Sequence, residues 1–114
     1  MIRKDDDKEA IQDILIKWLV DKENIPPTTR DFAAFELGMT KAEKSIDELL
    51  KILKNEYELP PVRNYCAMAL GMIMNKKDGR LNDLLDLAYK ETDWEVKKSL
   101  NNAILFITKY KEED

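Results

Sequence analysis

The chain has 114 residues, and its 19 Lys and Arg against 23 Asp and Glu give a formal net charge of −4. This length fits one domain, and the negative balance argues against a general binder of nucleic acid or of anionic membranes. Histidine is absent, which removes the commonest general base, the commonest zinc ligand and every catalytic arrangement built on histidine. No apolar run approaches the roughly 20 residues of a membrane span. We expect a cytoplasmic protein without enzyme activity, cofactor or metal.

From the N-terminus, apolar residues recur at the i, i+3, i+4 and i+7 spacing of an amphipathic helix, starting at Ile11, Ile46 and Leu81. Each start lies 35 residues after the one before. The pairs that begin at Pro26 and Pro60 suit the first turn of a helix, because a proline there loses no intrahelical hydrogen bond. The sequence predicts no strand and six helices, over residues 6–22, 27–39, 41–55, 60–75, 79–91 and 93–110.

The second half of each unit repeats as well. The segments that begin at Arg30 and Arg63 coincide after a shift of 33 residues and share basic, small, leucine and glycine positions. A third copy, residues 96–105, follows after a shift of 34 and lacks the glycine. We therefore predict one domain over residues 1–114. It comprises helix-pair repeats at about 6–39, 41–75 and 79–110 and a charged tail over 109–114.

These segments carry a family resemblance. Pro61-Val62-Arg63 followed by Cys66-Ala67-Met68-Ala69-Leu70-Gly71-Met72-Ile73 resembles the second helix of a HEAT repeat. The segment from Asp93 to Ile107 resembles the same helix with lysine for arginine, and the first unit departs more, with Thr29 for valine and Glu36 for the last alanine. The resemblance implies an all-α fold, a right-handed α-solenoid of three HEAT-like helix pairs, and a scaffold or protein-protein interaction role.

A tetratricopeptide repeat has nearly the same period, but it needs a small residue where this chain has Leu50 and Asp83. In a HEAT-like stack the apolar stripes of neighbouring units form one continuous core. The predicted core comprises Ile14, Leu15, Trp18, Leu49, Leu50, Leu53, Val62, Leu70, Ile73, Leu84, Leu85, Val96 and Ile104.

The remaining candidates for chemistry have simpler interpretations. Cys66 occupies a position that is small and buried in the HEAT pattern, and no histidine could activate it, so we expect a structural thiol. Gly38 and Gly71 are expected to allow close helix packing or to end a helix. Asp83 and Asp86 have helical spacing but lie on what we expect to be a solvated face.

The cations Arg30, Arg63 and Lys97 recur at equivalent places and form a row down the stack. In similar proteins such a row joins neighbouring units through acidic residues of the turns, and the candidates here are Glu58, Asp93 and Glu95. The alternative is a phosphate-binding row, because some HEAT-like DNA glycosylases hold DNA along this surface. Cofactor-attaching lyases built on HEAT-like repeats resemble the chain in fold alone.

In the HEAT pattern, the residues one, five and nine positions after the arginine face outward. Here they are Asp31, Phe35 and Met39, then Asn64, Met68 and Met72, then Lys98, Asn102 and Phe106. Five of the nine are large and apolar, which favours recognition of a partner helix, a peptide or a second copy. We predict a partner-binding surface of Phe35, Met39, Met68, Met72 and Phe106 with Asn64, Asn102 and Lys98 as a polar rim, and call it the second-helix face. A one-residue slip in register would instead make these residues core.

Overall fold

The computed structural model describes residues 4–111 of the chain. Within this range it contains six α-helices and no strand, which confirms the all-α prediction. They are α1 (Lys4–Val20), α2 (Pro27–Met39), α3 (Ile46–Lys54), α4 (Pro60–Ile73), α5 (Leu81–Lys90) and α6 (Trp94–Leu105). A single 3-10 turn, η1 (Glu43–Ser45), precedes α3, and a π-helical turn, η2 (Phe106–Tyr110), continues α6.

The second helices begin where the sequence predicts. Pro27 and Pro60 are the first residues of α2 and α4. Their fixed φ suits the first turn, where a backbone N–H would have no intrahelical acceptor. The last helix begins differently, because the Asp93 side chain accepts a hydrogen bond from the Val96 N–H at 3.1 Å and caps α6.

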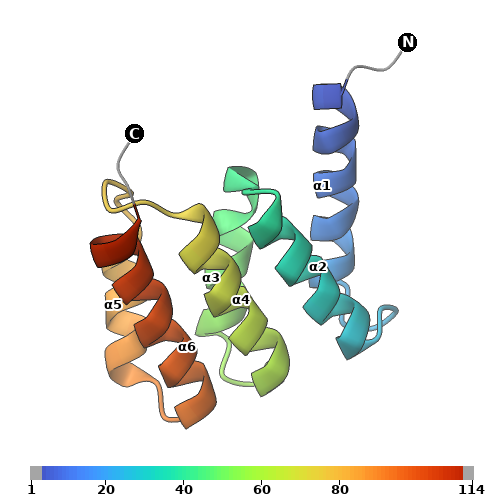
Figure 1. Ribbon diagram of the computed structural model, residues 1–114. Coiled ribbons are helices and arrows are strands. Elements are labelled where there is room, and N and C mark those ends of the chain that lie inside the picture. The colour runs from blue at the N-terminus through green and yellow to red at the C-terminus, as the bar shows by residue number, and fades with distance from the viewer. Residues whose placement is uncertain (1–3, 112–114) are drawn as a thin grey trace.

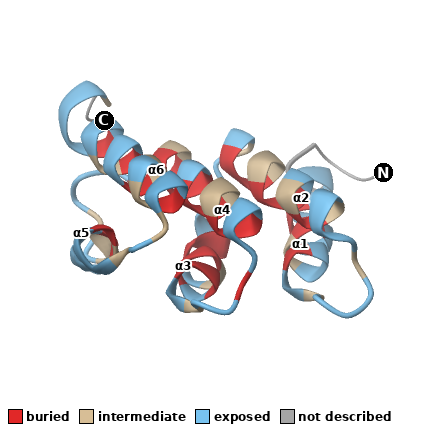
Figure 2. Cartoon of the chain, turned by 90° about the horizontal axis from the view of Figure 1, so that it is seen from below, coloured by how far each residue is buried: buried red, intermediate tan, exposed pale blue. Residues whose placement is uncertain are grey.

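The helices form two layers. Figure 2 shows α1, α3 and α5 in one layer and α2, α4 and α6 in the other, and Figure 1 shows the pairs following one another along the chain. Helix α4 lies in the middle and packs against α2, α3 and α6. None of the described helices combines the length and the apolar character needed to cross a membrane.

The two glycines at matched positions of α2 and α4 allow these helices to pack closely against their neighbours. A Cβ atom added to Gly38 would lie 2.9 Å from the Cα of Ala69. A Cβ on Gly71 would lie 3.0 Å from the Cβ of Ala103. The chain therefore uses glycine for helix packing, the first of the two roles expected from the sequence.

Most of the predicted core is buried, and its centre lies on α3 and α4. The correctly predicted residues are Leu15, Leu49, Leu50, Leu53, Val62, Leu70, Ile73, Leu84 and Val96, while Ile104 is half-buried. The prediction is wrong for Ile14, Trp18 and Leu85, which are 47%, 37% and 44% exposed.

The errors fall on the end helices of the first layer. Helix α3 packs against both α4 and α5, and its Leu49 and Leu53 are fully buried. Helix α1 packs mainly against α2, and the residues equivalent to those leucines, Ile14 and Trp18, have no neighbour to cover them. The apolar spacing marks the same stripe in every repeat, but only a helix inside the stack can bury all of it.

The charged segment at the C-terminal end contacts the end of α4. Lys111 Nζ donates hydrogen bonds to the carbonyl oxygens of Met72, at 2.8 Å, and of Met74, at the end of α4. These carbonyls have no intrahelical donor, and a cation stabilises that end of a helix. Within the charged segment predicted over 109–114, Lys111 is therefore anchored to α4, and residues 112–114 lie outside the described residues.

Candidate functional site

Arg30, near the start of α2, joins two repeats. Its Nε donates a hydrogen bond at 2.8 Å to the carbonyl oxygen of Leu19, in the last turn of α1. Its two terminal nitrogens donate to the two carboxylate oxygens of Glu58, at 2.9 and 2.8 Å. Both side chains are buried, and these hydrogen bonds hold the pKa of Glu58 below its usual value. The guanidinium thus ties its own helix pair to the turn of the next pair.

Arg63 repeats this arrangement one unit later. Its Nη2 donates to the carbonyl oxygen of Leu53 at 2.8 Å, and Nη1 and Nη2 bind the two oxygens of Glu91, the first at 3.0 Å. Glu91 follows Arg63 by 28 residues, the same separation as Arg30 and Glu58. Burial pushes the pKa of Glu91 upward, but the hydrogen bonds from Arg63 and from the Asp93 N–H outweigh it, and the net pKa is lowered.

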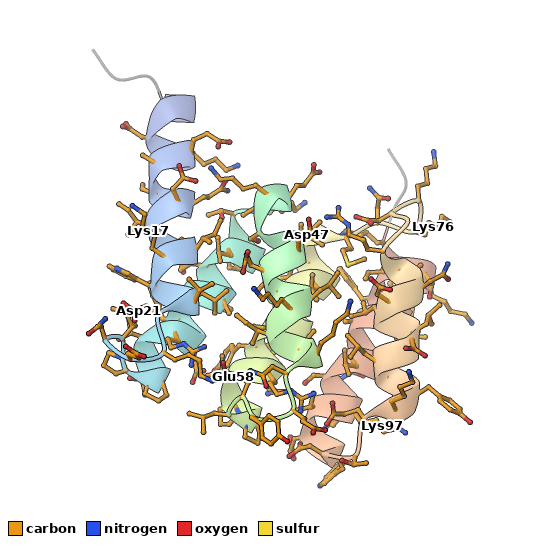
Figure 3. All side chains as sticks on the ribbon, turned by 180° about the vertical axis from the view of Figure 1, so that it is seen from behind. Lys17, Asp21, Asp47, Glu58, Lys76 and Lys97 are labelled. Carbon is orange, nitrogen blue, oxygen red and sulfur yellow. The ribbon has the colours of Figure 1, made fainter. Side chains whose placement is uncertain are left out.

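The acidic partners of Arg30 and Arg63 differ in part from the candidates predicted from the sequence. Glu58 is one of them, whereas Glu91 takes the place expected for Asp93 or Glu95. Asp93 instead caps α6, and Glu95 is exposed. Figure 3 shows Glu58 in the turn before α4 and Lys97 toward the same end of the stack.

Two of the three cations in the row are buried in ion pairs. Arg30 and Arg63 are 2% and 6% exposed, and each is occupied by a glutamate. Lys97 is half-buried, and its side chain makes no ion pair within the described part of the chain. Two of the three cations therefore have no surface left to offer a nucleic acid.

The second-helix face is open to solvent. Met39, Met68 and Phe106 are 56%, 39% and 45% exposed, and Phe35 and Met72 are half-buried. None of the five belongs to the core, so the alternative of a register slip is wrong. Uncovered apolar side chains that recur on successive helices are a feature of interaction surfaces.

A groove between α2 and α4 gathers part of this face. It has a volume of about 500 Å³. Helix α2 contributes Thr28, Asp31, Phe32 and Phe35, and α4 contributes Tyr65 and Met68. The groove brings together the predicted Phe35 and Met68. We refer to it as the α2–α4 groove.

Phe32 and Tyr65 line the groove but are not among the residues predicted for this face. They occupy equivalent positions, 33 residues apart, and Phe32 is 51% exposed. Two aromatic residues at one repeat position are a signal in the sequence. Counting positions along one helix does not place Phe32 and Tyr65 on the second-helix face. They reach the groove because α2 and α4 lie side by side.

The α6 part of the predicted surface does not contribute to this groove. Lys98 Nζ lies 5.7 Å from the centre of the Trp94 ring, a cation–π arrangement within α6. Asn64 accepts a hydrogen bond from the hydroxyl of Ser99. Asn102 is exposed, and the Phe106 ring centre lies 5.9 Å from Lys111 Nζ.

The other candidates for chemistry singled out in the sequence are buried or ion-paired. Cys66 is fully buried, and burial raises the pKa of its thiol, which keeps it protonated. Asp83 and Asp86 pair with Lys54 and Lys90, at 3.4 and 3.0 Å. Within residues 7–111, no group of three or more cysteine, aspartate and glutamate side chains is placed to hold a metal ion.

Two layers of helices, stacked as repeated pairs and joined by repeated arginine–glutamate clamps, define an α-solenoid protein. The family model of HEAT repeats matches residues 12–104. The chain belongs to the HEAT-repeat family. Comparisons with curated proteins and with solved structures give no match.

Proposed function

We propose that this chain is a non-catalytic interaction module or small scaffold subunit that binds a partner helix, a peptide or a second copy through the second-helix face. The observation that carries the proposal is the row of uncovered apolar side chains on α2, α4 and η2, with Met39, Met68 and Phe106 the most exposed of the predicted five. HEAT repeats generally mediate protein–protein interaction, which supports the same function.

The chemistry of the face suits recognition of a peptide or helix. Burying one large apolar side chain against a partner is worth about 1.5–3 kcal/mol before the costs of association. Methionine adapts its shape to different partners because its side chain is long, unbranched and polarizable. Asn102 and Lys98, two residues of the proposed rim, are exposed polar residues of α6 and are of the kind that surrounds such interfaces.

The arrangement of charges argues against the alternative of a nucleic-acid-binding factor. The cation row that this alternative requires is largely buried in ion pairs. Salt concentration separates the two functions experimentally. Affinity that depends on phosphate contacts falls steeply with ionic strength, whereas an apolar interface is nearly indifferent.

The experiment compares partner binding by the wild-type chain and by Met39→Glu with Met68→Glu. The partner is captured from the native host, purified, and titrated calorimetrically at two salt concentrations. Because both methionines are exposed, we expect the double variant to lose affinity at least a hundredfold while its melting temperature stays within about 2 °C of the wild type.

Leu85→Glu is the matched control. Leu85 is 44% exposed on α5, in the other layer, so the same kind of charge is introduced away from the second-helix face. Unchanged affinity in the double variant, or equal losses in the double variant and the control, would contradict the proposal. A steep loss of affinity with salt would favour the nucleic-acid alternative.

A further inference from the structure

The α2–α4 groove contains a carboxylate with one oxygen that the described residues do not satisfy. Oδ1 of Asp31 is buried, and it has no hydrogen-bond partner among the described residues. A buried polar atom without a partner costs free energy, and most such atoms in folded proteins find one. Burial raises the pKa of Asp31, and Arg30 opposes that shift only in part. The site is therefore short of a hydrogen-bond donor or a positive charge.

At the α4–α6 junction, the residue equivalent to Asp31 has a hydrogen-bond partner. Asn64 on α4 is the equivalent of Asp31 on α2, and its side-chain oxygen accepts a hydrogen bond from the Ser99 hydroxyl of α6. The residue equivalent to Ser99 in the α2–α4 junction is Tyr65. Tyr65 lines the groove instead of bonding to Asp31. The α2–α4 junction thus has Asp31 and a groove at the position where the α4–α6 junction has the hydrogen bond between Asn64 and Ser99.

The walls of the groove suit a cation. The rings of Phe32, Phe35 and Tyr65 line it together with Asp31. An aromatic face attracts an ammonium or guanidinium group, and the attraction is stronger when the cation is partly removed from water. The methylene stem of a lysine or arginine would lie against the rings and Met68.

The neighbouring charges leave this position open. Arg30 adjoins Asp31 in the sequence, but its guanidinium is fully engaged by Glu58 and the Leu19 carbonyl. The other residues that line the groove are uncharged. The chain as a whole carries a net charge of −4, which also favours a basic partner.

We propose that the α2–α4 groove binds a lysine or arginine side chain of the partner segment, with Asp31 as its counter-charge and the aromatic walls holding its stem. This inference rests on the proposed function and specifies the chemistry of the partner: a basic residue flanked by apolar ones. The apolar neighbours would lie on the rest of the second-helix face.

The experiment selects displayed random 12-residue peptides on the full chain and on two variants. Asp31→Asn removes the counter-charge at nearly constant shape. Glu36→Gln removes the same charge from the same helix, outside the groove lining. We expect the wild type and Glu36→Gln to enrich peptides with lysine or arginine beside apolar residues, and Asp31→Asn to lose that preference.

One selected peptide is then synthesised with its basic residue and, as a second version, with norleucine at that position. The wild type should bind the basic peptide at least tenfold more tightly than the norleucine version, whereas Asp31→Asn should bind both alike. Three results would overturn the inference. The wild type could enrich peptides without a preference for basic residues, Asp31→Asn could show the same preference as the wild type, or no peptide could be enriched.

Peptide binding by the double variant Met39→Glu with Met68→Glu distinguishes a failure of this inference from a failure of the proposed function. If peptides bind without a basic preference but are lost in Met39→Glu with Met68→Glu, the second-helix face is a docking surface and only the role of Asp31 is wrong. If peptide binding is indifferent to that double variant as well, both proposals are wrong.

Discussion

The Arg30 guanidinium and the Glu58 carboxylate form two parallel hydrogen bonds, at 2.9 and 2.8 Å, across a repeat boundary. Since Arg30 also binds the carbonyl oxygen of Leu19, one side chain holds the end of α1, the start of α2 and the turn before α4. Arg63 and Glu91 form the same arrangement at the next boundary. These two clamps keep the second helices in register, and the second-helix face depends on that register.

Glu58→Gln should destabilise the fold by about 3 kcal/mol, because it leaves the Arg30 charge buried without its counter-charge. Chemical denaturation monitored by circular dichroism measures this loss. Asp86→Asn is the control, since its partner Lys90 and Asp86 itself are both exposed, and such pairs contribute about 0–1 kcal/mol. Equal effects of the two substitutions would contradict the role of the clamp.

The clamps also predict a pH dependence. Folding lowers the pKa of Glu58. The stability that this carboxylate contributes is therefore complete above its unfolded pKa of about 4.3. It is lost as the pH falls from there through the lower pKa of the folded state. The difference in unfolding free energy between wild type and Glu58→Gln should therefore shrink below about pH 4.5. Urea titrations from pH 7 to pH 3 measure it. A difference that stays constant over this range would argue against an ionised clamp.

Gly38→Ala should destabilise the chain by about 1–2 kcal/mol, although alanine is the better helix former. The added Cβ would lie 2.9 Å from the Cα of Ala69, so α2 and α4 must separate. Gly79→Ala is the control, because nothing lies within 4 Å of a Cβ added there. Thermal unfolding of the two variants gives the comparison. A Gly38→Ala variant as stable as the wild type would show that the two helices are not in tight contact.

Much of the fold could be predicted from the sequence because the information is local and repeated. The prolines, the apolar spacing and the shared positions around Arg30 and Arg63 recur at nearly constant separation, and each recurrence reinforces the others. The exposure of Ile14 and Trp18 could not be predicted in this way, since it depends on how many neighbours α1 has and not on its own pattern.

The site was predictable only in part. Counting from the arginine placed Phe35, Met39 and Met68 on an outward face, because a spacing of four keeps side chains on one side of a helix. The choice of Glu91 over Asp93 depends on the conformation of a turn, which helical periodicity does not describe. The unsatisfied oxygen of Asp31 is a property of two packed helices, and no single-helix pattern contains it.

Asp31→Asn should raise the melting temperature at pH 7. The folded state raises the pKa of Asp31, so ionising this group costs stability once the pH exceeds the unfolded pKa of about 3.9. The gain should therefore shrink as the pH falls toward about 4 and vanish below about pH 3, where the wild-type carboxyl is protonated in both states. Differential scanning calorimetry across this range tests it, with Glu36→Gln, at another acidic residue of α2, as the comparison. A loss of stability at pH 7 would mean that the carboxylate has a partner in the folded protein.

The most direct test of the interaction surface is methionine oxidation by dilute hydrogen peroxide, followed by peptide mass spectrometry, with and without a saturating partner. Met39 and Met68 are 56% and 39% exposed, whereas Met74 is 1% exposed and serves as the internal reference. We predict that partner binding slows the oxidation of Met39 and Met68 at least fivefold and leaves Met74 slow in both states. Unchanged oxidation of Met39 and Met68 in the saturated complex would contradict a partner bound on the second-helix face.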